Sequence, residues 1–344
     1  MKRTSIVLLA LLAALLIGLT GCSSDPDDTP YIPTVYVAGY YNNGSLDIAC
    51  YWVDGERKHL DNPGAGNYKA YAITVANGSV YTAGEYDKGG DNWAACYWKD
   101  SKKVKDLPGD YTEIQDITVV EVGATHTVYV TGREYEDYTD TYYGCYWEDG
   151  VRDFISLAFA NVNAVTVAAD GTVYAAGDHL KDTDWVAYWW KDGNLQPDLS
   201  TDVSRVDYIA VVNQGGSPTV YAAGEDSAGV CSWVDGESTT LQGDGISINA
   251  ISGSGGKAYV SGTYYDAEHD TYRVCYWENG DLKPLPGNYA WANGIAASGG
   301  KAYVSGSYYD SDKDLNIACY WVGGGQPIPL EETIDSYAYG ICVK

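Results

Sequence analysis

Tyrosine and acidic residues recur side by side along this chain, in segments that could contact a ligand. A tyrosine ring offers a flat apolar face and a hydroxyl group, and a carboxylate accepts hydrogen bonds from hydroxyl groups or cations. This combination suits a glycan or a basic segment of a protein. The alternative is that acidic hairpins carry these residues for solubility and strand propensity. The candidate binding residues are Tyr40, Tyr41, Tyr86, Asp87, Tyr135, Glu136, Tyr264, Tyr265, Asp266, Tyr308, Tyr309, Asp310 and Trp291.

A second candidate site consists of polar residues that precede a recurring aliphatic residue by two positions. We expect them near the mouth of a central channel, where they could hold a small ligand or a cation. Alternatively, such residues satisfy backbone groups where a strand begins. They are Gln115, Asn163, Asp207, Asn249 and Asn293, and Tyr71 and Tyr339 occupy the same place in two further copies.

Sequence signals for catalysis or for a metal site are few. The Gly-x-Ser-x-Gly motif of serine hydrolases is absent, and the histidines and arginines are scattered. The segment Asp310-Ser311-Asp312-Lys313-Asp314 has the alternating carboxylates of a calcium loop but lacks its glycine and distal glutamate. We therefore expect no cofactor, with Ca²⁺ as the one ion considered. Paired carboxylates for glycoside hydrolysis stay an open alternative.

These candidates belong to a unit that is repeated along the chain. A Tyr-x-x-Gly sequence recurs at spacings of 38 to 48 residues, and a tryptophan follows each copy. A period near this length with strand-like segments indicates radial or solenoid repetition. The repeat tyrosines are Tyr36, Tyr81, Tyr129, Tyr174, Tyr221, Tyr259 and Tyr303, and the tryptophans are Trp52, Trp98, Trp147, Trp189, Trp233, Trp277 and Trp321.

Each unit resolves into four short strands. In the second unit we predict strands over residues 72–76, 80–86, 93–99 and 104–107. Asn-Gly and Asp-Gly pairs, including Asp170-Gly171, predict two-residue hairpin turns between strands. Seven such units without helical periodicity predict an all-β fold, a seven-bladed β-propeller of four-stranded blades over residues 34–344.

The two ends of the repeat region complete one blade between them. Residues 34–36 begin as a second strand, and residues 339–343 end as a first strand, so N- and C-terminal strands share the closing blade. The turns after the first and third strands then emerge on one face of the ring. The more variable connections emerge on the other, the long-loop face, where we expect binding residues.

Most cysteines take one place in the repeat. Six of them precede the repeat tryptophan by two positions, so both side chains share a face of the strand, and Ala187 takes this place in the fourth copy. Equivalent positions on adjacent blades should be about 10 Å or more apart, which is too far for a disulfide. We predict seven buried thiols, Cys342 included, and no disulfides.

The N-terminal segment resembles an export signal. Two basic residues precede an apolar run over residues 6–16, and the sequence Leu-Thr-Gly-Cys that ends at Cys22 resembles the lipobox of bacterial lipoproteins. The resemblance implies that residues 1–21 are a signal peptide and that Cys22 is acylated, with palmitate as an expected lipid. Residues 22–33 would be a flexible tether. The expected location is the bacterial cell envelope, lipid-anchored to a membrane and facing the periplasm or the cell surface.

The net charge and the arrangement of the repeats restrict the classes of function that we expect for this chain. The chain has 47 acidic and 21 basic residues and a formal net charge of −26, which argues against a nucleic-acid partner. The repeats resemble propellers of the NHL and kelch-like kind, and more closely the tyrosine-rich repeat lipoproteins of bacterial envelopes. This resemblance implies a fold and not an activity. We expect a monomeric, non-catalytic binding module for a glycan or a protein. The alternative is a propeller hydrolase or lyase that uses channel-mouth carboxylates.

Overall fold

The computed structural model describes residues 32–89, 93–109, 112–123, 125–136, 141–155, 160–199, 202, 204–214, 217–287 and 289–344. Residues Thr34–Lys344 form one compact unit. The predicted signal peptide, Cys22 and most of the predicted tether lie outside the described residues. All regular elements in these described ranges are β-strands. The same ranges contain no helix that is long and apolar enough to cross a bilayer.

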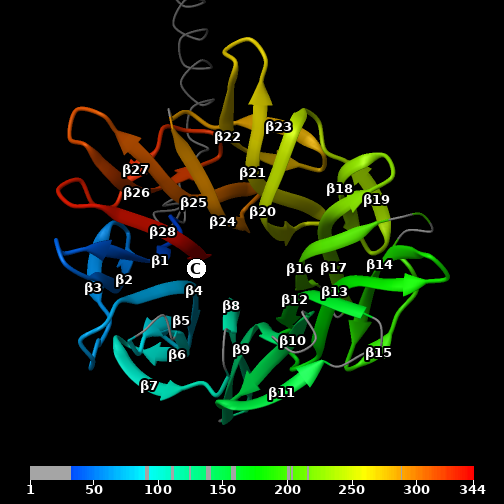
Figure 1. Cartoon of the computed structure of the whole chain (residues 1–344), viewed down its shortest axis with the longest axis horizontal. Coiled ribbons are helices and arrows are strands. Elements are labelled where there is room, and N and C mark those ends of the chain that lie inside the picture. Colours follow the sequence, from blue (N-terminus) through cyan, green and yellow to red (C-terminus); the bar gives the residue numbers. More distant parts are fainter. Residues whose placement is uncertain are drawn as a thin grey trace, which may run out of the picture. The chain divides into compact units, whose positions relative to one another are not determined.

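The strands form seven antiparallel, four-stranded sheets that are arranged as the blades of a ring (Figure 1), which confirms the predicted seven-bladed β-propeller. The innermost strand of each blade contacts that of the next blade around the ring. From the innermost strand outward, blade 1 is β28 (Ser336–Val343), β1 (Val35–Asn42), β2 (Asp47–Val53) and β3 (Glu56–His59); blade 2 is β4 (Tyr68–Ala76), β5 (Ser79–Asp87), β6 (Trp93–Lys99) and β7 (Lys102–Asp106); blade 3 is β8 (Thr112–Val122), β9 (Thr125–Glu136), β10 (Thr141–Glu148) and β11 (Val151–Ile155); blade 4 is β12 (Ala160–Val167), β13 (Val173–Lys181), β14 (Asp184–Lys191) and β15 (Asn194–Leu195); blade 5 is β16 (Arg205–Gln214), β17 (Ser217–Asp226), β18 (Gly229–Val234) and β19 (Glu237–Thr240); blade 6 is β20 (Asp244–Ser254), β21 (Lys257–Asp266), β22 (Thr271–Glu278) and β23 (Asp281–Pro284); blade 7 is β24 (Ala290–Ser298), β25 (Lys301–Asp310), β26 (Leu315–Val322) and β27 (Ile328–Pro329).

Blade 1 closes the ring with strands from both ends of the repeat region. β28 pairs with β1 in a register that runs from Val35 opposite Val343 to Tyr41 opposite Ser336. The backbone groups of Thr34 and Lys344 exchange two further hydrogen bonds, of 2.8 and 3.1 Å. The predicted sharing of the closing blade is therefore correct.

The innermost strand of every blade contains a β-bulge. β4 therefore begins at Tyr68, four residues before the predicted start, and continues past an extra residue at Tyr71. An extra residue of this kind bends its strand and redirects its side chain. The bulge residues are Tyr339, Tyr71, Gln115, Asn163, Asp207, Asn249 and Asn293, the seven positions that the sequence analysis places at the channel mouth.

The repeat glycine is required by this bulge. A Cβ atom on Gly262 would lie 2.0 Å from the backbone oxygen of Ser247, and one on Gly306 would lie 1.8 Å from that of Trp291. The other five repeat glycines meet the equivalent carbonyl at 1.9 to 2.3 Å. Any larger residue in this place would displace the innermost strand.

Six of the seven predicted repeat tryptophans, all except Trp189, pack between blades as fully buried side chains. Four of their indole nitrogens donate to backbone oxygens of the preceding blade's outer connection: Trp98 to Asp61 at 2.9 Å, Trp147 to Pro108 at 2.9 Å, Trp277 to Gln242 at 2.8 Å and Trp321 to Pro286 at 2.9 Å. The indole nitrogens of Trp52 and Trp233 are buried without a hydrogen-bond partner. Apolar burial and an inter-blade hydrogen bond are thus combined in one residue.

Blade 4 corrects the predicted repeat at two positions. Its fully buried tryptophan is Trp190, opposite Ala175, and the predicted Trp189 instead stacks on Tyr174 with ring centroids 6.0 Å apart. Tyr188, opposite Gly177, takes the cysteine position that was assigned to Ala187. Adjacent strand residues point to opposite faces, so an error of one residue reverses the assignment.

The seven cysteines that the structure describes are free thiols. Six are buried, and burial raises the pKa of Cys145 to about 12. The prediction that all seven are buried is wrong for Cys342, which is half-buried because it lies on the innermost strand β28.

Most predicted hairpin turns have the positive φ angles that they require, as at Asp54 and Gly55 (47° and 86°). The carboxylate of Asp54 also accepts a hydrogen bond from the Val35 backbone nitrogen at 2.8 Å. Asp170-Gly171 differs, because Asp170 is absent from the residues with positive φ and the turn is closed by a bond from Ala168 to Thr172 at 2.9 Å. This turn is therefore longer than the predicted two-residue hairpin.

Candidate functional site at the channel mouth

Three positions per blade, most of them occupied by polar residues, surround the mouth of the central channel on the long-loop face. One is the bulge residue. The second lies two residues before it on the innermost strand, and the third follows the repeat glycine on the adjacent strand and is paired with the second. From blade 1 to blade 7 these pairs are Tyr337 with Tyr40, Lys69 with Glu85, Glu113 with Arg133, Asn161 with Asp178, Arg205 with Glu225, Ser247 with Thr263, and Trp291 with Ser307.

The amide side chains among the bulge residues bind the backbone of the next blade. Asn163 donates to the backbone oxygen of Val206 at 2.8 Å, and Asn249 to that of Ala292 at 2.6 Å. Asn293 donates to Ala338 at 2.8 Å, and Gln115 donates to Asn163. These amides therefore hold adjacent blades together, which is the structural alternative considered from the sequence.

Asp207 interrupts this series, because an ionised carboxylate cannot donate a hydrogen bond. It lies 3.3 Å from the guanidinium group of Arg205. Burial raises the pKa of Asp207, and although Arg205 opposes this effect, the neighbouring Asp178 and Glu225 carboxylates add to it. Blade 5 thus has a carboxylate, Asp207, at the bulge position where blades 3, 4, 6 and 7 have an amide side chain.

A cavity of about 390 Å³ opens beside Asp207. It lies among blades 3 to 6, and both arginines in its wall are paired with carboxylates: Arg133 with Glu113 at 2.6 Å, and Arg205 with Asp207. Guanidinium, carboxylate and amide groups therefore face one space, as in sites that recognise polar ligands. The lining residues that matter here are Gln115, Arg133, Asn163, Arg205, Asp207 and Glu225.

A second cavity, of about 670 Å³, adjoins the first at the seam between blades 4 and 5. Arg205 and Glu225 line both cavities. Trp185, 41% exposed, forms part of the wall, together with Asp178 and Asp226. We call the two adjoining cavities the channel-mouth groove. Two arginines and four carboxylates line it.

Short hairpins flank the seam that holds the larger cavity. In blade 4, β13 ends at Lys181 and β14 begins at Asp184; in blade 5, β17 ends at Asp226 and β18 begins at Gly229. Two residues thus connect the second and third strands in these blades, whereas four or five do so in the other blades. The groove lies where the connecting loops are shortest.

The opposite side of the channel mouth is aromatic. Tyr40 stacks on Tyr337 and on Tyr339, with ring centroids 5.0 and 5.9 Å apart. Tyr71 meets Tyr339 edge-on at 5.1 Å. Tyr40 is only 8% exposed, so this predicted ligand contact is part of the packed cluster.

Glu85 is a half-buried carboxylate beside this aromatic cluster. Burial raises its pKa to about 7 from an ordinary value of 4.5; a hydrogen bond from the Ile114 backbone and the Lys69 charge oppose the rise, and Glu113 adds to it. Between these two pH values the folded state binds more protons than the unfolded state, so the free energy of unfolding falls as pH rises.

We expect Glu85→Gln to remove this pH dependence. Relative to wild type, the variant should gain about 1 to 2 kcal/mol of unfolding free energy between pH 5 and pH 8. Urea unfolding at several pH values measures the difference. Glu237→Gln, an exposed residue on β19, is the control. A Glu85→Gln profile parallel to that of wild type would contradict the assignment.

The hairpin residues predicted to bind a ligand mostly contact their own blade. The Tyr41 hydroxyl is 3.2 Å from His59, and Tyr86 stacks on Tyr68 at 5.1 Å. Asp87 accepts a hydrogen bond from the Gly89 backbone at 2.6 Å. Tyr264 and Tyr308 are half-buried. The side chains of Tyr135 and Glu136 lie outside the described residues.

The hairpins of blades 6 and 7 follow the same pattern. Asp266 forms an ion pair with Arg273 at 2.9 Å, and Tyr265 donates to Asp270. In blade 7, Tyr309 donates to Asp314 at 2.6 Å. These carboxylates mainly order their own loops.

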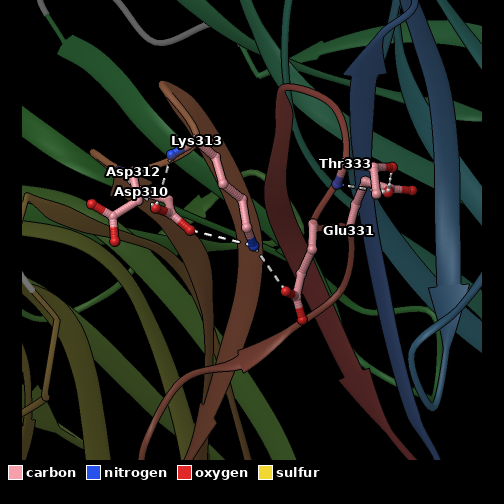
Figure 2. A network of polar contacts seen from close by, with 6 residues as sticks. Asp310, Asp312, Lys313, Glu331 and Thr333 are labelled. Atoms are coloured by element: carbon pink, nitrogen blue, oxygen red, sulfur yellow. Dashed lines mark hydrogen bonds and ion pairs between the residues drawn. The ribbon is translucent and has the colours of Figure 1, made fainter.

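Asp310, the start of the segment that resembles a calcium loop, belongs to a network with a lysine (Figure 2). Its carboxylate accepts a hydrogen bond from the Asp312 backbone at 3.0 Å and lies 3.3 Å from the Lys313 ammonium group. The same ammonium group donates to Glu332 at 2.9 Å. Within the described residues, no group of three His, Cys, Asp or Glu side chains is placed to hold a metal ion.

The groove contains residues that sequence reasoning missed. Arg133 and Arg205 line the same cavity although the arginines look scattered in the sequence. Trp185 and Glu225 belong to blades 4 and 5, whose hairpins between the second and third strands contain no tyrosine. A usable signal was present: the residue after each repeat glycine is polar, and in blades 2 to 5 it is charged.

Similarity to known proteins extends to the fold alone. No protein-family model and no curated protein sequence matches the chain. The β-propeller domain of the Trilobed protease from Pyrococcus furiosus, described as having an open velcro topology, is 11% identical with a TM-score of 0.51, over 87% of this chain and 92% of that one. An acylaminoacyl peptidase in complex with Z-Gly-Gly-Phe-chloromethyl ketone is 14% identical with a TM-score of 0.50, over 87% of this chain and 50% of that one. The present chain thus spans about half of the peptidase.

Proposed function

We propose that this protein is a lipid-anchored binding module of the bacterial cell envelope whose ligand is a glycan. The anchor rests on the lipobox-like sequence that ends at Cys22. Incorporation of a fatty-acid label by the full chain, and its loss in Cys22→Ser, tests this part. The binding function rests on the channel-mouth groove.

The groove favours a glycan over a protein surface as the ligand. It is recessed and lined by donors and acceptors in close succession, whereas protein interfaces are larger and have an apolar centre. Carboxylate and guanidinium groups bind hydroxyl groups, and the exposed Trp185 ring can cover the apolar face of a sugar. With four carboxylates and two arginines in its wall, the groove suits a neutral sugar better than an acidic one.

Arg205 is the residue to test, because it lines both cavities. Full-length Cys22→Ser protein should bind neutral oligosaccharides on a glycan array, and Arg205→Ala should weaken binding about tenfold or more through the loss of charged hydrogen bonds. Arg152→Ala, which breaks an ion pair with Glu134 at 2.7 Å, is the matched control. Thermal unfolding shows whether either variant is misfolded. An array without bound glycans, or equal effects of both substitutions, would count against the proposal.

The second candidate function is that of a propeller hydrolase or lyase, and the raised pKa of Asp207 supports it. A carboxylic acid that retains its proton can act as a general acid, and Glu225 in the same cavity could act as the base. Incubation of bound oligosaccharides with the protein separates the two functions. Shortened products that disappear in Asp207→Asn indicate an enzyme, and unchanged oligosaccharides indicate a binding module.

A further inference from the structure

Blade 7 presents two exposed aromatic side chains at the start of its innermost strand. Tyr289 is 74% exposed and Trp291 is 48% exposed. The residue equivalent to Trp291 is polar or charged in blades 2 to 6, and in blade 1 it is Tyr337, which stacks on Tyr40. Exposed aromatic rings of this kind are typical of a contact surface.

The backbone of Tyr289 has an unfavourable conformation, although its ring is exposed. Its φ angle is +50°, and the other described non-glycine residues with positive φ are Asp, Asn or Ser. A bulky side chain in this region of φ is strained, and strained residues concentrate at functional sites. The Tyr289 carbonyl accepts a hydrogen bond from the Tyr309 backbone at 3.1 Å, which holds the segment in place. Burial of the ring does not account for the strain.

The blade 7 strand that carries Trp291 is bonded to blade 6 at the end of the channel-mouth groove opposite Trp185. Ser247 and Ile248 of blade 6 line the smaller cavity, and the next residue, Asn249, donates to the Ala292 backbone at 2.6 Å. Ala292 directly follows Trp291. Blades 4, 5, 6 and 7 follow one another around the ring (Figure 1). Trp185 belongs to blade 4, Arg205 and Glu225 to blade 5, the cavity wall of Ser247 and Ile248 to blade 6, and Trp291 to blade 7.

We propose that the ligand is an extended oligosaccharide that lies across the channel mouth from blade 4 to blade 7. One sugar would stack on Trp185 and bind Arg205 and Glu225, and a sugar further along the chain would stack on Trp291 and Tyr289. This inference rests on the proposed glycan-binding function and adds to it a second aromatic subsite and a minimum ligand length.

Calorimetry with neutral size series tests the subsite. The series are β-1,4-glucose, α-1,4-glucose and chitin oligomers of one to six sugars, measured with full-length Cys22→Ser protein. For the series that binds, affinity should rise with length until both aromatic subsites are filled. Trp291→Ala should lower the affinity of the longest oligomer by about three- to tenfold and leave the shortest bound oligomer unchanged. Trp185→Ala should weaken both.

Phe154→Ala, an exposed aromatic on the outer strand β11, is the matched control and should change neither affinity. If affinity does not depend on length and Trp291→Ala binds all oligomers as wild type does, the second subsite is wrong while the glycan function stands. If no oligomer in any series binds, both proposals are overturned.

Discussion

Deletion of residues 336–344 is expected to abolish the cooperative unfolding transition of the propeller. These residues include β28, the innermost strand of blade 1, which pairs with β1 and contacts the innermost strands of blades 7 and 2. Without β28, β1 becomes an open edge and buried residues such as Ala38 and Trp52 lose their cover. The loss should exceed the whole free energy of unfolding of an ordinary domain, about 5 to 15 kcal/mol.

Near-UV circular dichroism during thermal unfolding measures this effect, because the ring is rich in tyrosine and tryptophan. Deletion of residues 23–31, a segment of equal length at the other end, is the control and should leave the transition unchanged. A synthetic peptide of residues 334–344 added to the truncated chain should restore the signal, since it can pair with β1. A truncated protein that unfolds at the wild-type temperature would show that ring closure is not needed for stability.

Gly262→Ala is expected to lower the free energy of unfolding by about 3 kcal/mol, at the upper end for a single added methyl group. The new Cβ atom would lie 2.0 Å from the Ser247 backbone oxygen, so β20 must move away from β21. The same shift would displace the Ser247 and Ile248 wall of the smaller cavity.

Urea unfolding of Gly262→Ala should therefore be compared with Thr263→Ala, the adjacent residue on the same strand. Thr263→Ala removes atoms at the channel mouth without a backbone collision, and its effect should be below about 1 kcal/mol. Equal free energies of unfolding for the two variants would contradict the proposal that the close approach of the innermost strand requires a glycine at position 262.

Hairpin chemistry and repeat spacing made most of the fold predictable. Turn pairs such as Asp54-Gly55 set local geometry, and the recurrence of Tyr-x-x-Gly set the number of blades. The error in blade 4, where Trp190 is buried in place of Trp189, came from two adjacent tryptophans. The Trp-x-Asp-Gly spacing of blades 1, 3 and 5 would have resolved it, because it ties the tryptophan to the turn that fixes register.

The channel-mouth positions were predictable, but their role was not. Residues such as Asn163 were selected by their spacing from the next aliphatic residue, and each proved to be the extra residue of a bulge. A bulge depends on how two strands pair and leaves no mark in the hydrophobic pattern. Whether an amide there faces a ligand or bonds the next blade, as Asn163 does with Val206, depends on the neighbouring blade.

By itself, the sequence determined the repeat, the four strands of each unit and the sharing of one blade by both ends, because turn chemistry and alternation act over a few residues. Only the tertiary structure decided where the groove lies. Arg133 and Arg205 are 72 residues apart and meet at one cavity because the ring brings blades 3 and 5 around a common channel. The short hairpins of blades 4 and 5 leave the seam between these blades uncovered. This opening forms only when the two blades pack against each other in the folded ring.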